Sequence, residues 1–170
     1  HILKLKMVGV ILDTNIYGIA LWKKDVAHIL VFLAEEKQKS EKRFVILGTE
    51  IVNEEINDTP HKETRARLNE LYQVVISGEI KLSDNIKTLA REYFNECKNK
   101  HIKITLEDCL IVASSCFANV DFIVTDNRKT MMNQKAIEVF TLIDKKNGLR
   151  TPKFIGPEAL KSFLLGSGVS

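Results

Sequence analysis

The chain has 170 residues, of which 45% are hydrophobic and 28% charged, and this size and composition predict one globular domain. No stretch approaches the roughly 20 continuous apolar residues of a membrane-spanning helix, so we expect a soluble, cytoplasmic protein without membrane contacts. A formal net charge of +3 is too small to indicate nucleic-acid binding by itself. We place the domain at residues 7–166 and treat residues 1–6 as an N-terminal extension.

The three cysteines argue against two classes of small protein. Cys97, Cys109 and Cys116 are odd in number and form no CxxC pair. This pattern disfavours both a disulfide framework and a zinc knuckle, and it fits a reducing compartment. The sequence therefore predicts buried, free thiols.

Short apolar runs alternate with helical patterns along the whole chain. In order, the patterns predict a strand at 8–15, a helix at 25–38, a strand at 43–49, helices at 49–58 and 61–77, a weak strand at 79–83, helices at 84–100 and 106–118, a strand at 121–127, a helix at 133–145, a weak strand at 153–156 and a helix at 157–165. Thr59 with Pro60, Ser83 and Pro157 are expected to start helices. This alternation predicts an α/β domain of three layers, a Rossmann-like parallel sheet with helices on both faces.

Two aspartates follow buried strands in this arrangement. Asp13 ends the run VGVIL, and Asp126 follows FIV after one intervening residue. Ligands of open α/β sheets bind beyond the carboxyl ends of the strands, which makes both aspartates candidate site residues. Each taken singly also fits an ordinary turn or helix-capping role.

Glu55 lies on the apolar face of the helix expected at 49–58. With Ile51 at 0° and about 100° per residue, Glu55 falls at about 40°, whereas Glu54 falls at about 300° and is expected in solvent. A carboxylate on a buried stripe needs a partner. A salt bridge and a bound metal ion are the two interpretations.

Asp108 stands in the first turn of LEDCLIVASSCFA, a helix that is apolar almost all around. Thr105 followed by Asp108 resembles a capping box, which is a sufficient structural explanation. The apolar neighbours of Asp108 nevertheless favour it over Glu107 as a site residue.

Considered together, four segments resemble the PIN-domain nuclease family, including its toxin-like, VapC-type single-domain ribonucleases. The segments are ILDTN, TEIVNEEI, LEDCLIVA and VTDN, and they contain Asp13, Glu55, Asp108 and Asp126 in the family's order. The resemblance implies a sheet of about five strands in the order 3-2-1-4-5. It also implies a catalytic and metal-binding role for these four acids.

The resemblance is least regular at its fourth position. Many relatives have one residue between the threonine and the acid, whereas Thr125 and Asp126 are adjacent here, so Asn127 competes with Asp126 for the site. Thr14 and Asn15 are expected to orient Asp13, and Thr125 to orient Asp126. Turn formation is the alternative role of these polar residues.

Clustered carboxylates imply a cation as cofactor. Two like charges about 4 Å apart repel by roughly 4 kcal/mol at an effective dielectric near 20. Oxygen ligands without histidine or cysteine favour Mg²⁺ or Mn²⁺, which can activate water for attack on a phosphodiester. An RNA substrate would need cations around such a pocket, and Arg128 with Lys129 are the best candidates.

The sequence thus predicts a metal-dependent endoribonuclease, possible partners being RNA, an antitoxin protein and a second copy of the chain. Alternatives are a PIN nuclease of RNA processing and a catalytically weak PIN-fold interaction module. A magnesium-dependent phosphatase of the haloacid dehalogenase type is disfavoured because Asn15 stands where its second aspartate belongs. A nucleotide-binding domain is disfavoured because neither GxGxxG nor GxxxxGKS/T follows a strand.

Overall fold

A parallel sheet of five strands organises the structure, a computed structural model that describes residues 6–168. The strands are β1 (Val8–Leu12), β2 (Phe44–Thr49), β3 (Gly78–Ile80), β4 (Phe122–Val124) and β5 (Lys153–Ile155), in the order β3-β2-β1-β4-β5. The predicted order is confirmed. Of the expected N-terminal extension, residues 1–5 lie outside the described residues.

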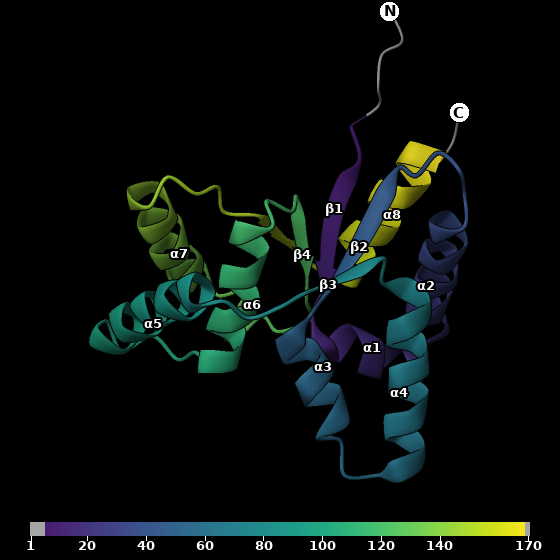
Figure 1. Ribbon diagram of the computed structural model, residues 1–170, viewed down its shortest axis with the longest axis horizontal. Coiled ribbons are helices and arrows are strands. Elements are labelled where there is room, and N and C mark those ends of the chain that lie inside the picture. Colours follow the sequence, from purple (N-terminus) through teal and green to yellow (C-terminus); the bar gives the residue numbers. More distant parts are fainter. Residues whose placement is uncertain (1–5, 169–170) are drawn as a thin grey trace, which may run out of the picture.

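Helices lie on both sides of this sheet, as the three-layer prediction requires. The helices are α1 (Thr14–Ala20), α2 (Lys24–Lys37), α3 (Glu50–Asn57), α4 (Lys62–Val75), α5 (Asp84–Asn99), α6 (Leu106–Phe117), α7 (Gln134–Lys146) and α8 (Pro157–Gly168). Figure 1 shows α5, α6 and α7 grouped on one side of the molecule and α2, α4 and α8 on the other. Within residues 6–168, no helix combines the length and apolar character needed to cross a membrane.

The central strands read as continuous apolar runs because both faces of the sheet are covered. Val10, Ile11 and Leu12 of β1 are buried, and β1 pairs with β2 on one side and β4 on the other. The chain turns from β1 towards β2 and β3, and later crosses to β4 and β5. The reversal of strand order therefore falls at β1 and β4, where open α/β sheets form their binding crevice.

Two helix starts differ from prediction. The strand expected at 8–15 ends at Leu12, and Asp13 caps the unpredicted helix α1, where its carboxylate accepts a hydrogen bond from the Thr14 amide (2.8 Å). Helix α4 begins at Lys62 with His61 as its cap, rather than at Thr59 and Pro60. Ser83 and Pro157 start α5 and α8 as expected.

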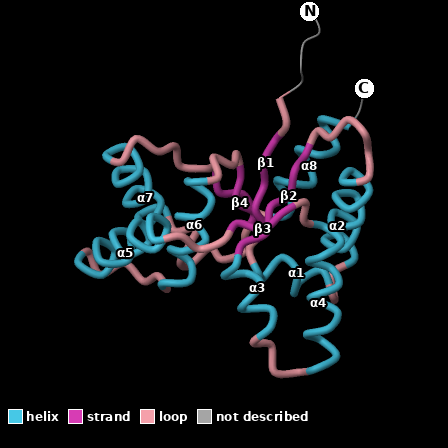
Figure 2. The backbone as a smooth tube through the Cα atoms, in the orientation of Figure 1, coloured by secondary structure: helices cyan, strands magenta, loops and turns pink. Residues whose placement is uncertain are grey.

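The short helices α1 and α3 lie beyond the carboxyl ends of the strands (Figure 1), and the tube in Figure 2 shows each following its strand after a sharp turn. Thr49 ends β2 and caps α3 by accepting the Val52 amide hydrogen bond (3.1 Å). Glycine is required at Gly48 because a Cβ there would collide with the buried Tyr72 of α4. This close packing fixes where α3, and with it Glu55, leaves the sheet.

Candidate active site

Three of the four predicted acids gather at the carboxyl end of the sheet. Asp13 is the N-cap of α1, Glu55 lies on α3, and Asp108 lies in the first turn of α6. Asp13 and Asp108 are buried, and Glu55 is half-buried while its neighbour Glu54 is exposed. Three elements that are far apart in sequence thus bring three carboxylates together.

Each of these acids accepts a hydrogen bond from a threonine hydroxyl. Thr125 Oγ1 donates to Asp13 Oδ2 (2.7 Å), and Thr14 Oγ1 donates to Glu55 Oε1 (2.9 Å). Thr130 Oγ1 donates to Asp108 Oδ2 (2.9 Å). In each bond the carboxylate is the acceptor, and a carboxylate oxygen that accepts one hydrogen bond keeps a second lone pair for another contact.

The surroundings of Asp13 and Glu55 oppose their ionisation. Burial, with a smaller contribution from the charge of Asp108, raises the pKa of Asp13 from its usual 3.8 to about 6. Burial and the charges of Asp13, Asp108 and Glu107 raise the pKa of Glu55 from 4.5 to about 7. Among residues 6–168, none of the three gathered acids forms an ion pair with a basic side chain.

Asp126 lies apart from these three acids. Its side chain is exposed, and only its amide contacts the site, where it donates to Asn15 Oδ1 (3.3 Å). Asn15 Nδ2 in turn reaches Thr125 Oγ1 at 3.5 Å. Thr125 therefore bonds the carboxylate of Asp13, and not that of Asp126 as expected from sequence.

Asn127 serves the loop after β4. Its amide donates to Thr125 Oγ1 (3.0 Å), and its side-chain oxygen accepts from the Thr130 amide (3.2 Å). These two bonds hold the loop that carries Arg128 and Lys129, both of which are exposed. The side-chain oxygen of Asn127 is thus used within the loop.

Thr130 and Glu107 are the site residues that sequence reasoning missed or set aside. Thr130 is buried although it stands in an irregular loop, where no periodicity marks the direction of a side chain. Glu107 is exposed, yet its charge acts on Glu55. The expected capping box is half present, since Thr105 accepts the Asp108 amide (3.1 Å) while the Asp108 carboxylate turns to Thr130.

The donor chemistry of this end of the sheet fits a hard divalent cation. Mg²⁺ prefers oxygen ligands, keeps several waters and commonly uses only one or two carboxylates together with phosphate oxygens. Among the described residues, no three acidic, histidine or cysteine side chains form a group that could by itself hold a metal ion. The arrangement therefore suits an ion held by two carboxylates and water, rather than a closed protein cage.

Solved structures resemble this chain, although it matches no protein-family model and no curated protein sequence. VapBC2 from Rickettsia felis, solved bound to a DNA fragment from its promoter, is 18% identical, with a TM-score of 0.57 over 88% of this chain and 98% of that one. VapBC-1 from nontypeable Haemophilus influenzae is 16% identical, with a TM-score of 0.55 over 89% and 99%. FitAcB from Neisseria gonorrhoeae is 13% identical, with a TM-score of 0.53 over 87% and 97%. At these identities the likeness shows a shared fold.

Proposed function

We propose that this protein, which has the PIN-domain fold, is a divalent-metal-dependent endoribonuclease. The observation that carries the proposal is the set of three inward carboxylates, each bonded by a threonine and none paired with a cation in the described part of the chain. Repulsion among such groups costs stability unless protons or cations offset it. A site that retains this repulsion is suited to recruit a cation from outside.

Asp13 and Asp108 are the proposed direct ligands of Mg²⁺ or Mn²⁺. Both are buried, and in each a threonine hydroxyl donates to one carboxylate oxygen. The other oxygen of Asp108 would face the ion, and Oδ1 of Asp13, which accepts the Thr14 amide, would reach it through a second lone pair. When bound, the ion would polarise a water for in-line attack on phosphorus and neutralise charge on the phosphoryl group. Glu55 would orient that water, and Asp126 would act from the exposed rim.

RNA is the proposed substrate, held by cations outside the acidic pocket. Arg128 and Lys129 are exposed on the loop after β4. Thr130 joins this loop to Asp108, and Asn127 joins it to Thr125, whose hydroxyl bonds Asp13. Phosphate contacts of this kind add to the salt dependence of binding. Replacing both residues by alanine should therefore weaken RNA binding. The slope of the logarithm of the binding constant against the logarithm of the salt concentration should become shallower by about two, one for each lost phosphate contact.

The proposed biological role is that of a toxin whose partner is an antitoxin protein. This role rests on the fold shared with VapBC2 of Rickettsia felis and with the other VapBC structure described above. Assembly into a homodimer is compatible with this role. A role in RNA processing is the alternative for a nuclease of the same fold. A catalytically weak PIN-fold interaction module is the second candidate, favoured by the lack of a three-ligand metal group among residues 6–168.

Cleavage of RNA by the Asp108→Asn variant tests the proposal. The wild-type chain should cut a mixed RNA substrate with Mn²⁺ and should stop when the metal is chelated. In Asp108→Asn the cleavage rate should fall by more than the about 10- to 100-fold that is typical when a residue only orients a metal ligand. Asp58→Asn, which changes an exposed aspartate at the end of α3, is the control and should keep full activity. Equal cleavage with and without metal would refute the metal dependence, and no cleavage in either condition would favour the interaction module.

A further inference from the structure

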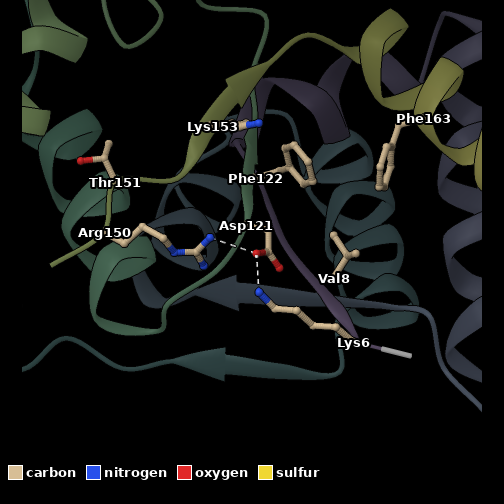
Figure 3. A pocket seen from close by; sticks show the side chains of 8 residues that line it. All are labelled: Lys6, Val8, Asp121, Phe122, Arg150, Thr151, Lys153 and Phe163. Atoms are coloured by element: carbon tan, nitrogen blue, oxygen red, sulfur yellow. Dashed lines mark hydrogen bonds and ion pairs between the residues drawn. The ribbon is translucent and has the colours of Figure 1, made fainter. Parts of the chain in front are cut away.

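A second pocket lies at the opposite end of the sheet. Its volume is about 390 Å³, and Lys6, Val8, Asp121, Phe122, Arg150, Thr151, Lys153 and Phe163 line it. The lining comes from the amino ends of β1, β4 and β5 and from α8 (Figure 3). Asp121 and Asp126 flank β4, five residues apart, so about 16 Å of strand separates this pocket from the acidic end.

Positive charge exceeds negative charge in this pocket, and part of it is fixed in place. Figure 3 shows Asp121 between Arg150 and Lys6, at 3.1 and 3.8 Å. Arg150 is held further by Asn119 Oδ1 (3.1 Å) and by the carbonyl oxygens of Asn119 (3.0 Å) and Val120 (3.2 Å). Because the guanidinium group is anchored on three sides, its charge cannot swing away.

Asp121 balances only part of this charge. Its Oδ2 accepts the Gly9 amide (2.9 Å), and its Oδ1 faces Arg150 and Lys6. The pocket thus contains one carboxylate and three basic side chains, and the exposed Lys153 has no ion-pair partner within residues 6–168. The pocket is therefore suited to an anion.

An apolar wall accompanies the charges. Phe122 and Phe163 pack with their ring centroids 5.3 Å apart, and Val8 lies beside them (Figure 3). Both rings are half-buried, so part of each remains open to a ligand. Flat aromatic bases stack on such rings, whereas a bare inorganic ion gains nothing from them.

We propose that this pocket binds a nucleotide, with its phosphate at Lys153 and its base against Phe122 and Phe163. The phosphate can come from a free nucleotide or from the RNA chain. In the second case the pocket is an anchor for RNA at a distance from the acids. Binding of a free nucleotide does not depend on the chain being a nuclease.

The test follows backbone amide signals by NMR during titration with adenosine 5′-monophosphate and, separately, with inorganic phosphate. Shifts should concentrate at Gly9, Asp121 and Phe122, and the nucleotide should bind more tightly than phosphate. Lys153→Glu should weaken binding about tenfold, as expected for reversing one nearby charge. Lys87→Glu, which changes an exposed lysine of α5, should have no effect.

A second variant separates the base from the phosphate. Phe163→Leu keeps an apolar side chain and should reduce nucleotide affinity towards that of inorganic phosphate. Kinetics of RNA cleavage by Lys153→Glu distinguish the two sources of the ligand. If RNA occupies the pocket, KM should rise at unchanged kcat; if a free nucleotide occupies it, both KM and kcat should stay unchanged. The proposal would be overturned if amide signals of the pocket did not shift at millimolar nucleotide, or if only signals at the acidic end shifted. Equal effects of Lys87→Glu and Lys153→Glu on binding would also overturn it. Absence of RNA cleavage by the wild-type chain would refute the proposed function but would leave the binding of a free nucleotide in this pocket untouched.

Discussion

Carboxylates at the two ends of the sheet have opposite kinds of partner. At the amino ends of the strands, buried Glu36 meets Lys39 (2.8 Å) and Arg43 (3.2 Å), and Asp121 meets Arg150 (3.1 Å). Although burial alone would raise both pKa values, Lys39 and Arg43 lower the pKa of Glu36, and the Gly9 amide together with Arg150 and Lys6 lowers that of Asp121. Groups within the fold therefore compensate the negative charge of these two acids.

At the carboxyl ends, Asp13, Glu55 and Asp108 accept hydrogen bonds from hydroxyl groups instead. The pKa of Asp13 and that of Glu55 rise, and no basic side chain in the described part of the chain pairs with them. Basic side chains thus pair with the acids at the amino ends of the strands, and none in the described part of the chain pairs with the three acids at the carboxyl ends. This difference distinguishes a site for an external cation from ordinary buried ion pairs.

The largest expected effect separates Glu55 from Glu54. Glu55→Gln should reduce manganese-dependent RNA cleavage by about 100-fold or more, because it removes a charge that positions water and metal. Its Tm without metal should rise, since one member of a repelling group becomes neutral. Glu54→Gln, on the exposed side of α3, should change neither quantity. Equal cleavage by the two variants would remove Glu55 from the site.

The matched substitution at the amino end should have the opposite effect on stability. Glu36→Gln leaves Lys39 and Arg43 without their buried carboxylate, so the Tm should fall by roughly 5 °C. Thermal unfolding of Glu36→Gln and Glu55→Gln, both without metal, measures the contrast directly. Shifts of the same sign would show that the two ends do not differ in the way proposed.

Thr130 should matter through Asp108. Thr130→Val keeps the shape of the side chain but removes the hydroxyl that holds Asp108 Oδ2, so Mn²⁺ affinity should fall about tenfold. Thr130→Ser should restore it, and Thr88→Val on the exposed side of α5 is the control. Calorimetric titration with Mn²⁺ provides the measurement. A loss of Tm in Thr130→Val with unchanged affinity would make Thr130 a purely structural residue.

The smallest effect is the pH dependence of the metal-free protein. Because the folded state raises the pKa of Asp13 from 3.8 to about 6 and that of Glu55 from 4.5 to about 7, it binds more protons than the unfolded chain in this range. These two acids therefore contribute stability that is present below about pH 4 and is lost as the pH rises to about 7, roughly 1–2 kcal/mol after solvent screening. Urea unfolding in chelator should show this decline, and Asp13→Asn should flatten it. A decline of full size in Asp13→Asn would assign it to other groups.

Much of the fold could be predicted because its signals are local. Continuous apolar runs marked the three central strands, and helical periodicity marked seven of the eight helices. Helix α1 escaped because it spans only 7 residues and contains Gly18, so it shows little periodicity. The start of α4 was misplaced because Thr59 and Pro60 form a common capping pattern, whereas His61 rarely fills this role.

Burial of the site residues was predictable where helical geometry decides it. The contrast of Glu55 with Glu54 followed from about 100° per residue, and the structure places the first half-buried and the second exposed. Partners across the fold were not predictable: Thr125 bonds Asp13, which lies 112 residues away in sequence. The catalytic roles of all four acids stay predictions, and the exposed position of Asp126 sets it apart from the others.

Under the proposed function, the bond between Thr130 and Asp108 would couple the binding of metal to the binding of RNA. Thr130 belongs to the loop that carries Lys129, so this single contact joins an acid of α6 to the segment that would grip phosphate. A cation arriving at Asp108 would fix the carboxylate and, through the threonine, its loop. The cation would thus add to the bonds of Asn127 that already hold the loop, and a more rigid loop lowers the entropic cost of binding the substrate. Under the proposed function, bound metal should therefore tighten the binding of RNA.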